Sequence, residues 1–472
     1  MVVVGDGIYD GREAVTPMGS FFLHPTLQQL VNGVFGFKNP IDVDALKAQL
    51  RTSILRHPRF CSVLAKNGDG SDCWRRIRPE EVDLDRHVVV VSEEEELAGG
   101  EDFVNKYVGS LTIDTSLDMK RPLWEVHVLR SNRCCVFRVH HVLGDCTSFL
   151  ALFLDSCQRV DDVSLPPSIP SLRKTPATSS LTKNASLFQR LLLFLSFVWY
   201  TIVYCTLLVL HSFWIRDDPS PITGGAGVEL WPRMVRTLTI KLSDMKLVKT
   251  TFNGTINDVL LGIISLGLER YLELKNISKL NKPLRVTGLV ITNLRPTSGL
   301  QSLESLMKSD SRVGWGNKFG VMLLPFYLGK RLADPIQHLR KLKEMTCAKK
   351  LSLEAIFSLK GYTFVKAVLG GKIAAKMNYN IISNTTFSVS NIMGPLDEMM
   401  FAGNPITYIR PTSTGLPQAM FVHMVSYMDK ADIHIQVVKN IIPDPDVLVK
   451  CFEDALHSMK SSAMQINKKE GV

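Results

Sequence analysis

A pair of adjacent histidines at positions 140 and 141 is the feature of this sequence best suited to acid–base chemistry. His140 and His141 follow an apolar run, and Gly144 and Asp145 come shortly after them. A histidine of ordinary pKa is mostly neutral at pH 7 and can take a proton from an attacking hydroxyl. Such general-base help contributes about 10²–10⁴ in rate. A lone core histidine is usually only a polar group with a hydrogen-bond partner. Two adjacent histidines followed by a glycine and an aspartate at a predicted strand-to-helix turn are a more specific indication of function. We expect one imidazole to project into a cleft while the Asp145 carboxylate turns back to fix the loop, for example on an arginine.

Other chemistries lack their usual residues in this sequence. There is no Gly-x-x-x-x-Gly-Lys phosphate-binding loop and no Gly-x-Ser-x-Gly nucleophile motif. The nine cysteines are scattered, with no Cys-x-x-Cys pair and no accompanying histidine spacing. We therefore expect no metal site, no cofactor and no disulfide framework, and we place the bulk of the chain in a reducing, cytosolic environment.

The elements that would position the histidines follow from hydrophobic periodicity. Residues 125–130 and 134–139 are short, rich in β-forming side chains and separated by a turn, which predicts a hairpin that enters a sheet. Helical spacing follows at 147–157. Further along, the pattern predicts helices at 256–274 and 444–459, and strands at 284–292, 385–390, 419–428 and 431–438. Helices and strands in no strict alternation predict an α/β (α+β) fold of mixed sheets with flanking helices.

The chain of 472 residues is long enough for two or three packed units. Residues 161–186 hold four prolines and many Ser/Thr, and 216–227 are again rich in Pro and Gly. We therefore divide the chain into an N-terminal lobe at 1–160, a connector at 161–229 and a C-terminal lobe at 230–472.

The connector contains an apolar segment, 191–215, with no Asp, Glu, Lys, Arg, Pro or Gly. As a helix it would be about 37 Å long, which exceeds the ~30 Å hydrocarbon core of a bilayer. Its few polar residues do not gather into a broad face, so an amphipathic surface helix fits poorly. The segment predicts insertion into a membrane; a buried central helix of a soluble domain is the alternative.

The formal net charge of +10 is concentrated in one stretch. Between Lys330 and Lys376 there are eleven Lys/Arg against three acidic residues. No stacking aromatics or nucleic-acid motif accompany them, which argues against nucleic acid as a partner. An anionic membrane surface, a phosphate-rich small molecule or a merely solvated face each fits this charge.

Four motifs in order resemble one family. The stretch from His140 to Asp145 is similar to the His-His-x-x-x-Asp-Gly signature of the wax ester synthase/diacylglycerol acyltransferase family, within the wider chloramphenicol-acetyltransferase-like fold. Pro122-Leu123-Trp124-Glu125 resembles that family's Pro-Leu-Trp-Glu box. Asn257-Asp258 resembles its Asn-Asp motif, and residues 390–395 (SNIMGP) resemble its late Ser-Asn-x-x-Gly-Pro turn. The match spans residues 15–460, and the organisation most resembles the plant branch.

The resemblance implies two pseudo-symmetric lobes around a tunnel, where an acyl group passes directly from acyl-CoA to an alcohol. It implies that His141 is the general base, that His140 supports it and that Asp145 is a structural anchor. Asn257, Ser390 and Asn391 become candidate substrate-binding residues, and the two asparagines are candidate donors to the oxyanion; each asparagine could instead hold a turn or cap a helix. Acyl-CoA is then a co-substrate. The acceptor is a long-chain fatty alcohol, which gives a wax ester, or diacylglycerol, which gives triacylglycerol.

One position departs from the signature, because Cys146 stands where the family has glycine. If the turn needs a left-handed backbone there, a cysteine would cost on the order of 1 kcal/mol or more. The alternative interpretation is a catalytically silent protein that binds acyl-CoA or lipid on the same fold. A soluble acyltransferase for small alcohols or amines is a third possibility, which the apolar connector disfavours.

The apolar segment also raises a question of topology. A single crossing would put the lobe with His141 and the lobe with Asn391 on opposite sides of the membrane, and the tunnel could not form. Basic residues before the segment mildly favour such a crossing, but the shared tunnel weighs more. We therefore expect partial or tilted insertion with both lobes cytosolic at the endoplasmic reticulum membrane, with the plasma membrane as an alternative.

Overall fold

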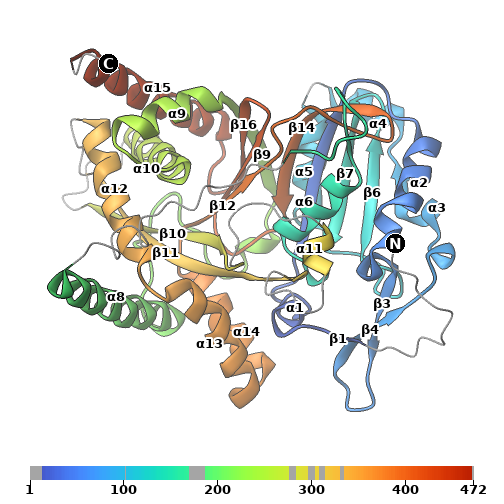
Figure 1. Cartoon of the computed structure of the whole chain (residues 1–472), viewed down its shortest axis with the longest axis horizontal. Coiled ribbons are helices and arrows are strands. Elements are labelled where there is room, and N and C mark those ends of the chain that lie inside the picture. The colour runs from blue at the N-terminus through green and yellow to red at the C-terminus, as the bar shows by residue number, and fades with distance from the viewer. Residues whose placement is uncertain are drawn as a thin grey trace.

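Two large β-sheets lie side by side, and helices pack around them (Figure 1). A computed structural model describes residues 13–100, 102–168, 186–275, 283–295, 303–307, 314–329 and 334–469. One sheet has seven strands in the order β5-β6-β7-β2-β14-β13-β8, and the other has six in the order β11-β10-β12-β15-β16-β9. A small third sheet has the order β1-β4-β3. Both large sheets combine parallel and antiparallel pairs, so the predicted mixed α/β architecture is confirmed.

The strands have the following bounds. The seven-stranded sheet comprises β5 (Val88–Val90), β6 (Trp124–Leu129), β7 (Cys134–His140), β2 (Leu30–Phe37), β14 (Asn404–Ser413), β13 (Met399–Phe401) and β8 (Gln158–Arg159). The six-stranded sheet comprises β11 (Phe319–Leu328), β10 (Leu284–Asn293), β12 (Phe387–Met393), β15 (Met420–Tyr427), β16 (Lys430–Val438) and β9 (Arg233–Lys241). The small sheet comprises β1 (Glu13–Ala14), β4 (Asp72–Arg76) and β3 (Ser62–Lys66).

Helices flank both large sheets. Those of the N-terminal lobe are α1 (Pro17–Phe21), α2 (Val43–Thr52), α3 (Leu84–His87), α4 (Glu93–Gly99), α5 (Phe103–Leu111) and α6 (Cys146–Asp155). The connector helix α8 (Leu187–Phe213) follows. The C-terminal lobe has α9 (Leu242–Thr251), α10 (Ile256–Leu274), α11 (Leu303–Met307), α12 (Pro335–Lys350), α13 (Glu354–Leu369), α14 (Gly371–Ser383) and α15 (Pro445–Lys469).

Strands β13 and β14 cross from the C-terminal half of the sequence into the N-terminal sheet. Strand β14 pairs with β2, and β13 pairs with β8. The division at residue 230 stays a prediction from the sequence. In the structure, residues 399–413 belong to the sheet formed mainly by the N-terminal part of the chain. Because of this exchange the two lobes are joined through backbone hydrogen bonds as well as through side chains.

The elements predicted near the site agree with the structure. The apolar helix begins earlier in the chain than predicted. The helix expected at 256–274 is α10, and the hairpin expected at 125–139 is β6 and β7. The closing helix is longer than predicted and continues to Lys469. The apolar helix starts at Leu187 instead of 191, because Ser186 and Gln189 form a reciprocal cap at its N-terminus.

The six-stranded sheet has two different faces. One face carries Val389, Val422 and Ile435 in register across β12, β15 and β16, and these belong to a core that includes side chains of α10 and α15. The opposite face is turned toward the N-terminal lobe, since its residues Ser390 and His423 line a pocket together with His141. The second face therefore forms one wall of the space between the lobes.

Candidate active site

The segment from His140 to Asp145 forms the turn between β7 and α6. His140 is the last residue of β7, a short 3₁₀ turn spans His141–Leu143, and α6 begins at Cys146. Asp145 is the N-cap of α6, and its Oδ1 accepts from the Ser148 N–H at 2.9 Å. Aspartate suits this position because the first amides of a helix have no partner within the helix. The two histidines and the aspartate thus lie at a strand-to-helix turn, where the sequence predicts them.

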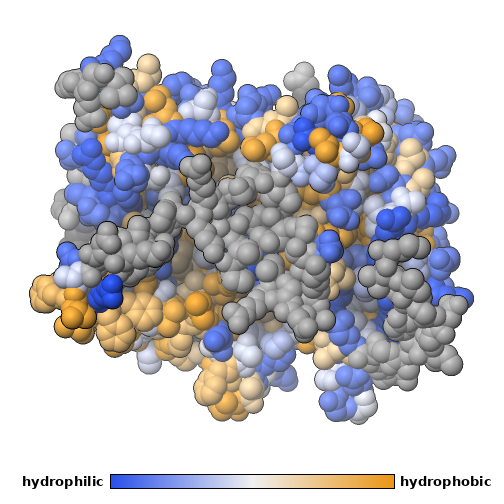
Figure 2. Space-filling view, viewed as in Figure 1, coloured by the Kyte–Doolittle hydropathy of each residue, from blue (hydrophilic) through white to orange (hydrophobic). Residues whose placement is uncertain are grey.

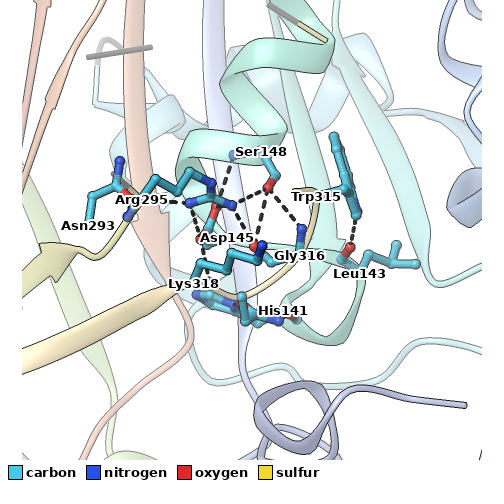
Figure 3. A network of polar contacts seen from close by, with 10 residues as sticks. His141, Leu143, Asp145, Ser148, Asn293, Arg295, Trp315, Gly316 and Lys318 are labelled. Carbon is cyan, nitrogen blue, oxygen red and sulfur yellow. Dashed lines mark hydrogen bonds and ion pairs between the residues drawn. The ribbon is translucent and has the colours of Figure 1, made fainter. Parts of the chain in front are cut away.

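Asp145 turns back onto a buried arginine of the other lobe (Figure 3). Arg295 follows β10, and its Nη1 and Nη2 donate to the two carboxylate oxygens at 2.7 and 3.1 Å. The Lys318 N–H donates to Oδ2 at 2.9 Å. Arg295 also donates to the Gly316 carbonyl and to the Ser148 hydroxyl. Within the described residues none of the Asp145 hydrogen bonds reaches the His141 ring, so the carboxylate holds the loop and the two lobes together.

The orientation of the His141 ring is set by Asn317. The amide Nδ2 of Asn317 donates to the His141 carbonyl at 2.8 Å, and its Oδ1 lies 2.9 Å from His141 Nδ1. Because the amide nitrogen faces the carbonyl, the amide oxygen faces the ring, and Nδ1 must carry the hydrogen. This tautomer leaves the lone pair on Nε2. Phe22 stacks on the ring with centroids 4.1 Å apart, which restricts its rotation.

Burial keeps both histidines neutral. Burial lowers the pKa of His141 below its usual range, and the Asp145 charge and the Asn317 hydrogen bond partly oppose this change. Burial, followed by the charge of His141, lowers the pKa of His140 to about 3. His140 is fully buried, and its Nδ1 accepts from the Val142 N–H at 3.1 Å. His141 can therefore act as a neutral base, whereas His140 supports the backbone of the turn.

His141 lines a pocket between the lobes. Its walls are mostly apolar and come from α1, β2, β10, β11, α14 and β15: Met18, Phe21, Phe22, Val31, Leu289, Ile291, Phe319, Val321, Ile381, Ile382 and Phe421. Polar residues share the lining, among them Gln29, Asp145, Thr147, Asn293, Ser358, Asn378, Ser390, Asn391, Thr412, Ser413 and His423. A largely apolar enclosure with polar groups beside a base suits a long alkyl chain that ends in a reactive oxygen.

Cys146 lies between this pocket and a second cavity inside the N-terminal lobe. The second cavity shares Val31, Cys146 and Ile392 with the first, and its remaining lining is apolar, with Phe35, Phe60, Phe137, Phe149 and Phe153 among it. Burial raises the pKa of the Cys146 thiol to about 12, so this cysteine is a neutral apolar group. Within the described ranges, no three His, Cys, Asp or Glu side chains are grouped so that they could hold a metal ion.

The two asparagine motifs meet in the structure. Asn391, on β12, donates from Nδ2 to Asn257 Oδ1 at the start of α10. Ser390 and Asn391 line the pocket with His141, whereas Asn257 lies outside the lining residues and is exposed. The Asn391 amide retains a second N–H, so it remains a candidate donor to the oxyanion. Asp258 caps α10 and accepts from the Thr346 hydroxyl at 2.8 Å, which is a structural role.

The Pro-Leu-Trp-Glu motif and the glycine of the Ser-Asn-x-x-Gly-Pro motif contribute to the scaffold. Trp124 is buried, and its Nε1 donates to the Phe60 carbonyl at 3.0 Å. Glu125 pairs with the buried guanidinium of Arg138 at 2.8 Å. At Gly394 an added Cβ would lie 2.1 Å from the Ser426 carbonyl oxygen, so only glycine fits the turn after β12. None of these residues lines the pocket with His141, and Trp124 lines the second cavity.

Sequence reasoning missed the side chains that hold the loop from the opposite lobe. These are Arg295, Asn317 and Trp315, whose Nε1 donates to the Leu143 carbonyl at 2.7 Å. The glycines at 314 and 316 around Trp315 are a signal of an unusual loop. No spacing rule, however, connects residues near 300 with a turn near 140.

Solved structures share this fold along nearly the whole chain. A wax ester synthase/diacylglycerol acyltransferase from Marinobacter aquaeolei VT8 superposes with a TM-score of 0.59 at 19% identity, and the match covers 96% of this chain and 99% of that one. The first condensation domain of the calcium-dependent antibiotic synthetase superposes with a TM-score of 0.57 at 14% identity, covering 96% of each chain. The protein therefore has the chloramphenicol-acetyltransferase-like fold that it shares with condensation domains.

Sequence comparison narrows the class to one family. Residues 32–211 match the model of the wax ester synthase/diacylglycerol acyltransferase catalytic domain, and residues 315–460 match the WS/DGAT C-terminal domain. Wax ester synthase/diacylglycerol acyltransferase 7 from Arabidopsis thaliana is 32% identical over 96% of this chain and 98% of its own. Wax ester synthase/diacylglycerol acyltransferase 11 from the same plant is 30% identical over 96% of each chain. The chain belongs to the wax ester synthase/diacylglycerol acyltransferase family, and this supports acyl transfer in wax ester or triacylglycerol synthesis.

Proposed function

We propose that the protein is an acyl-CoA-dependent O-acyltransferase that esterifies long-chain fatty alcohols, diacylglycerol or both, with acyl-CoA as co-substrate and no bound cofactor. The observation that carries this proposal is the His141 ring, held by Asn317 in the tautomer with a free Nε2 and lining an apolar pocket between the lobes. Family membership supplies the reaction type.

The proposed reaction is direct attack. Nε2 of His141 takes the proton from the acceptor hydroxyl as its oxygen bonds to the thioester carbonyl carbon. The carbon–sulfur bond then breaks, and the CoA thiolate leaves with the proton from the imidazolium. The remaining N–H of Asn391 is the candidate donor to the oxyanion between these steps. Asp145 is not needed for the proton transfer, and no covalent nucleophile is needed for the acyl transfer.

The catalytically silent alternative rested on Cys146, and the backbone at this residue supports the acyltransferase proposal instead. Cys146 is the first residue of α6 and has no positive φ. The expected cost of a left-handed backbone therefore does not arise at this position. Its side chain lines two cavities.

Ester synthesis by the purified full chain tests the proposal. Radiolabelled palmitoyl-CoA would be incubated with hexadecanol or with dioleoylglycerol, and lipid products separated by chromatography. We expect His141→Gln to lower the rate by about 10²–10⁴-fold, and the exposed His457→Gln to serve as a matched control. Unchanged activity in His141→Gln would exclude it as the base. Absence of ester with either acceptor would favour a binding protein.

Membrane association is the second part of the proposed function, and α8 is its main support. Among the described helices, α8 alone is by itself long and apolar enough to cross a membrane. It does not stand apart from the protein, because it packs along α12, α13 and α14 (Figure 1). The ammonium of Lys349 lies 3.9 Å from the Tyr204 ring centroid. Asn380 and Asn384 donate to the carbonyls of Ser212 and His211 at 2.9 and 2.7 Å.

The outer side of α8 continues into the exposed apolar side chains of α13. Trp199 on α8 and Phe364 on α13 are 64% and 68% exposed, and Figure 2 shows apolar surface over both regions. An apolar surface of this extent on packed lobes suits insertion into one leaflet. We propose that this face inserts with both lobes on the cytosolic side of the endoplasmic reticulum membrane, or alternatively of the plasma membrane.

Two measurements test this arrangement. Phe364→Glu should weaken flotation of the protein with phospholipid vesicles, whereas Met464→Glu, at an exposed apolar site on α15, should not. The sequon at Asn253 is exposed, and its glycosylation in microsomes would place the C-terminal lobe in the lumen and contradict the arrangement. The sequon at Asn384 is unsuitable as a reporter, because its side-chain amide is buried against α8.

A further inference from the structure

The wall of the pocket formed by the C-terminal sheet carries a row of polar side chains. Ser390, His423 and His434 are direct partners across β12, β15 and β16, and Thr237 continues the row on β9. Register partners in a sheet point to the same face, so the row crosses the face that looks toward the N-terminal lobe. Thr237 Oγ1 and His434 Nδ1 lie 2.7 Å apart and are hydrogen-bond partners. The two residues of the row that line the pocket are Ser390 and His423, and polar side chains on a buried sheet face are unusual.

Strand β14 adds hydroxyl groups to the same pocket. Thr412 and Ser413 line it together with His423, and the exposed fractions of the three residues are 0%, 4% and 4%. Thr412 Oγ1, Ser413 Oγ and both ring nitrogens of His423 have no hydrogen-bond partner among the described residues. Buried polar atoms nearly always have partners, because losing water without a replacement is unfavourable. A ligand that brings oxygen atoms into the pocket would supply the missing partners.

The hydrogen-bonding capacity of the three side chains matches ester groups. Burial, followed by the charge of His141, lowers the pKa of His423 to about 3, so its ring is neutral and offers one N–H and one acceptor nitrogen. The hydroxyls of Thr412 and Ser413 add two donors. Phe421 packs against the His423 ring with centroids 3.9 Å apart and fixes its plane. Together the three residues offer three donors, and ester carbonyls are acceptors.

The position of these groups beside His141 points to the acceptor molecule. The acceptor hydroxyl must reach the base, and a simple fatty alcohol has no second oxygen to place on neighbouring donors. Diacylglycerol carries two ester groups within a few bonds of its hydroxyl. Building on the acyltransferase function proposed above, we propose that Thr412, Ser413 and His423 bind the ester groups of a glycerolipid acceptor, so that diacylglycerol is the preferred substrate class.

Conservative substitutions test this site without disturbing the fold. Thr412→Val with Ser413→Ala removes two unpaired hydroxyls and keeps the side-chain shapes, so the variant should fold at least as well as the unmodified protein. The kcat/KM values for dioleoylglycerol and hexadecanol would be measured with saturating palmitoyl-CoA. We expect the diacylglycerol value to fall roughly tenfold through KM, and the ratio of diacylglycerol to alcohol to fall by the same factor.

A second variant and a control separate recognition from stability. His423→Leu should lower the same ratio further. Thr346→Val breaks a buried hydrogen bond to Asp258, and neither of these residues lines the pocket. It should leave the ratio unchanged, because both acceptors are turned over by the same folded molecules.

The possible results are distinguishable. The glycerolipid site would be overturned if the variants made wax ester with no shift in the ratio of diacylglycerol to alcohol. It would also be overturned if the unmodified protein made wax ester but no detectable triacylglycerol. In both cases the acyltransferase function would stand. A raised KM for palmitoyl-CoA with both acceptors would assign these groups to the pantetheine arm and also overturn the proposal. Failure of the unmodified protein to make either ester would overturn the proposed function itself.

Discussion

The ion pair between Asp145 and Arg295 should matter for stability more than for proton transfer. The Arg295 side chain is fully buried, and Asp145 is its carboxylate partner across the lobes. Among the described residues, Arg295→Leu leaves that carboxylate buried with only the two backbone donors of Ser148 and Lys318. Breaking a buried pair from one side costs about 3–5 kcal/mol. For a unit the size of one lobe, this corresponds to a fall of roughly 10 °C in the unfolding temperature.

Thermal unfolding of the full chain, followed by intrinsic fluorescence in detergent, measures this effect. The double variant Asp145→Asn with Arg295→Leu should be more stable than Arg295→Leu alone, because no unpaired buried charge remains. Arg78→Leu breaks an exposed pair with Glu81 and is the matched control. Its unfolding temperature should change by no more than about 2 °C.

Enzyme activity, measured well below the unfolding temperature, shows whether Asp145 anchors the loop or acts as a charge partner for the His141 imidazole. Because Asp145 makes no hydrogen bond to the His141 ring among the described residues, Asp145→Asn should retain much more activity than His141→Gln. Suppose instead that Asp145→Asn unfolds at the unmodified temperature yet loses as much activity as His141→Gln. The carboxylate would then act in the chemistry, and the reasoning from the Arg295 contacts would be refuted.

Three further predictions follow from the same geometry. Asn317→Leu frees the His141 ring and should lower kcat by about 10- to 100-fold, with little change in the KM for either substrate; an unchanged kcat would contradict its positioning role. Since a lowered pKa keeps the base neutral in mild acid, kcat/KM should fall only below pH 6.5, and a loss that begins above this pH would contradict the burial of His141. Cys146→Gly should join the two apolar cavities and shift the acyl-CoA preference toward longer chains, which a chain-length series measures.

Acid should also destabilise the fold, and the sign follows from burial. The pKa values of His57 and His140 are lowered to about 3 in the folded protein by burial, whereas an unfolded histidine titrates near 6.5. The unfolded chain therefore binds more protons between these pH values. The stability that the two neutral rings contribute is complete above pH 6.5 and is lost as the pH falls toward 3.

The elements around the base were predictable because local patterns determine them. The β6–β7 hairpin, the start of α6 and helix α10 each follow from short-range periodicity and from a cap residue such as Asp145 or Thr255. Long-range pairing was not predictable in this way. Nothing in the sequence of β14 indicates that it pairs with β2, which lies near the opposite end of the chain. The same limit applies to Arg295 and Asn317, which meet the histidine turn only after the lobes pack.

The amino-acid sequence of strand β15 contains an indication of the pocket. A strand buried on both faces is normally apolar throughout, yet residues 420–427 (MFVHMVSY) place a histidine among apolar side chains. Residues 430–438 (KADIHIQVV) repeat this on the neighbouring strand with His434 and Gln436. A soluble sheet packed against helices would gain nothing from polar groups at these places, because each must find a partner or lose stability. Buried polar positions in register on successive strands therefore indicate the sheet face that meets a ligand, and the amino-acid sequence alone carries this signal.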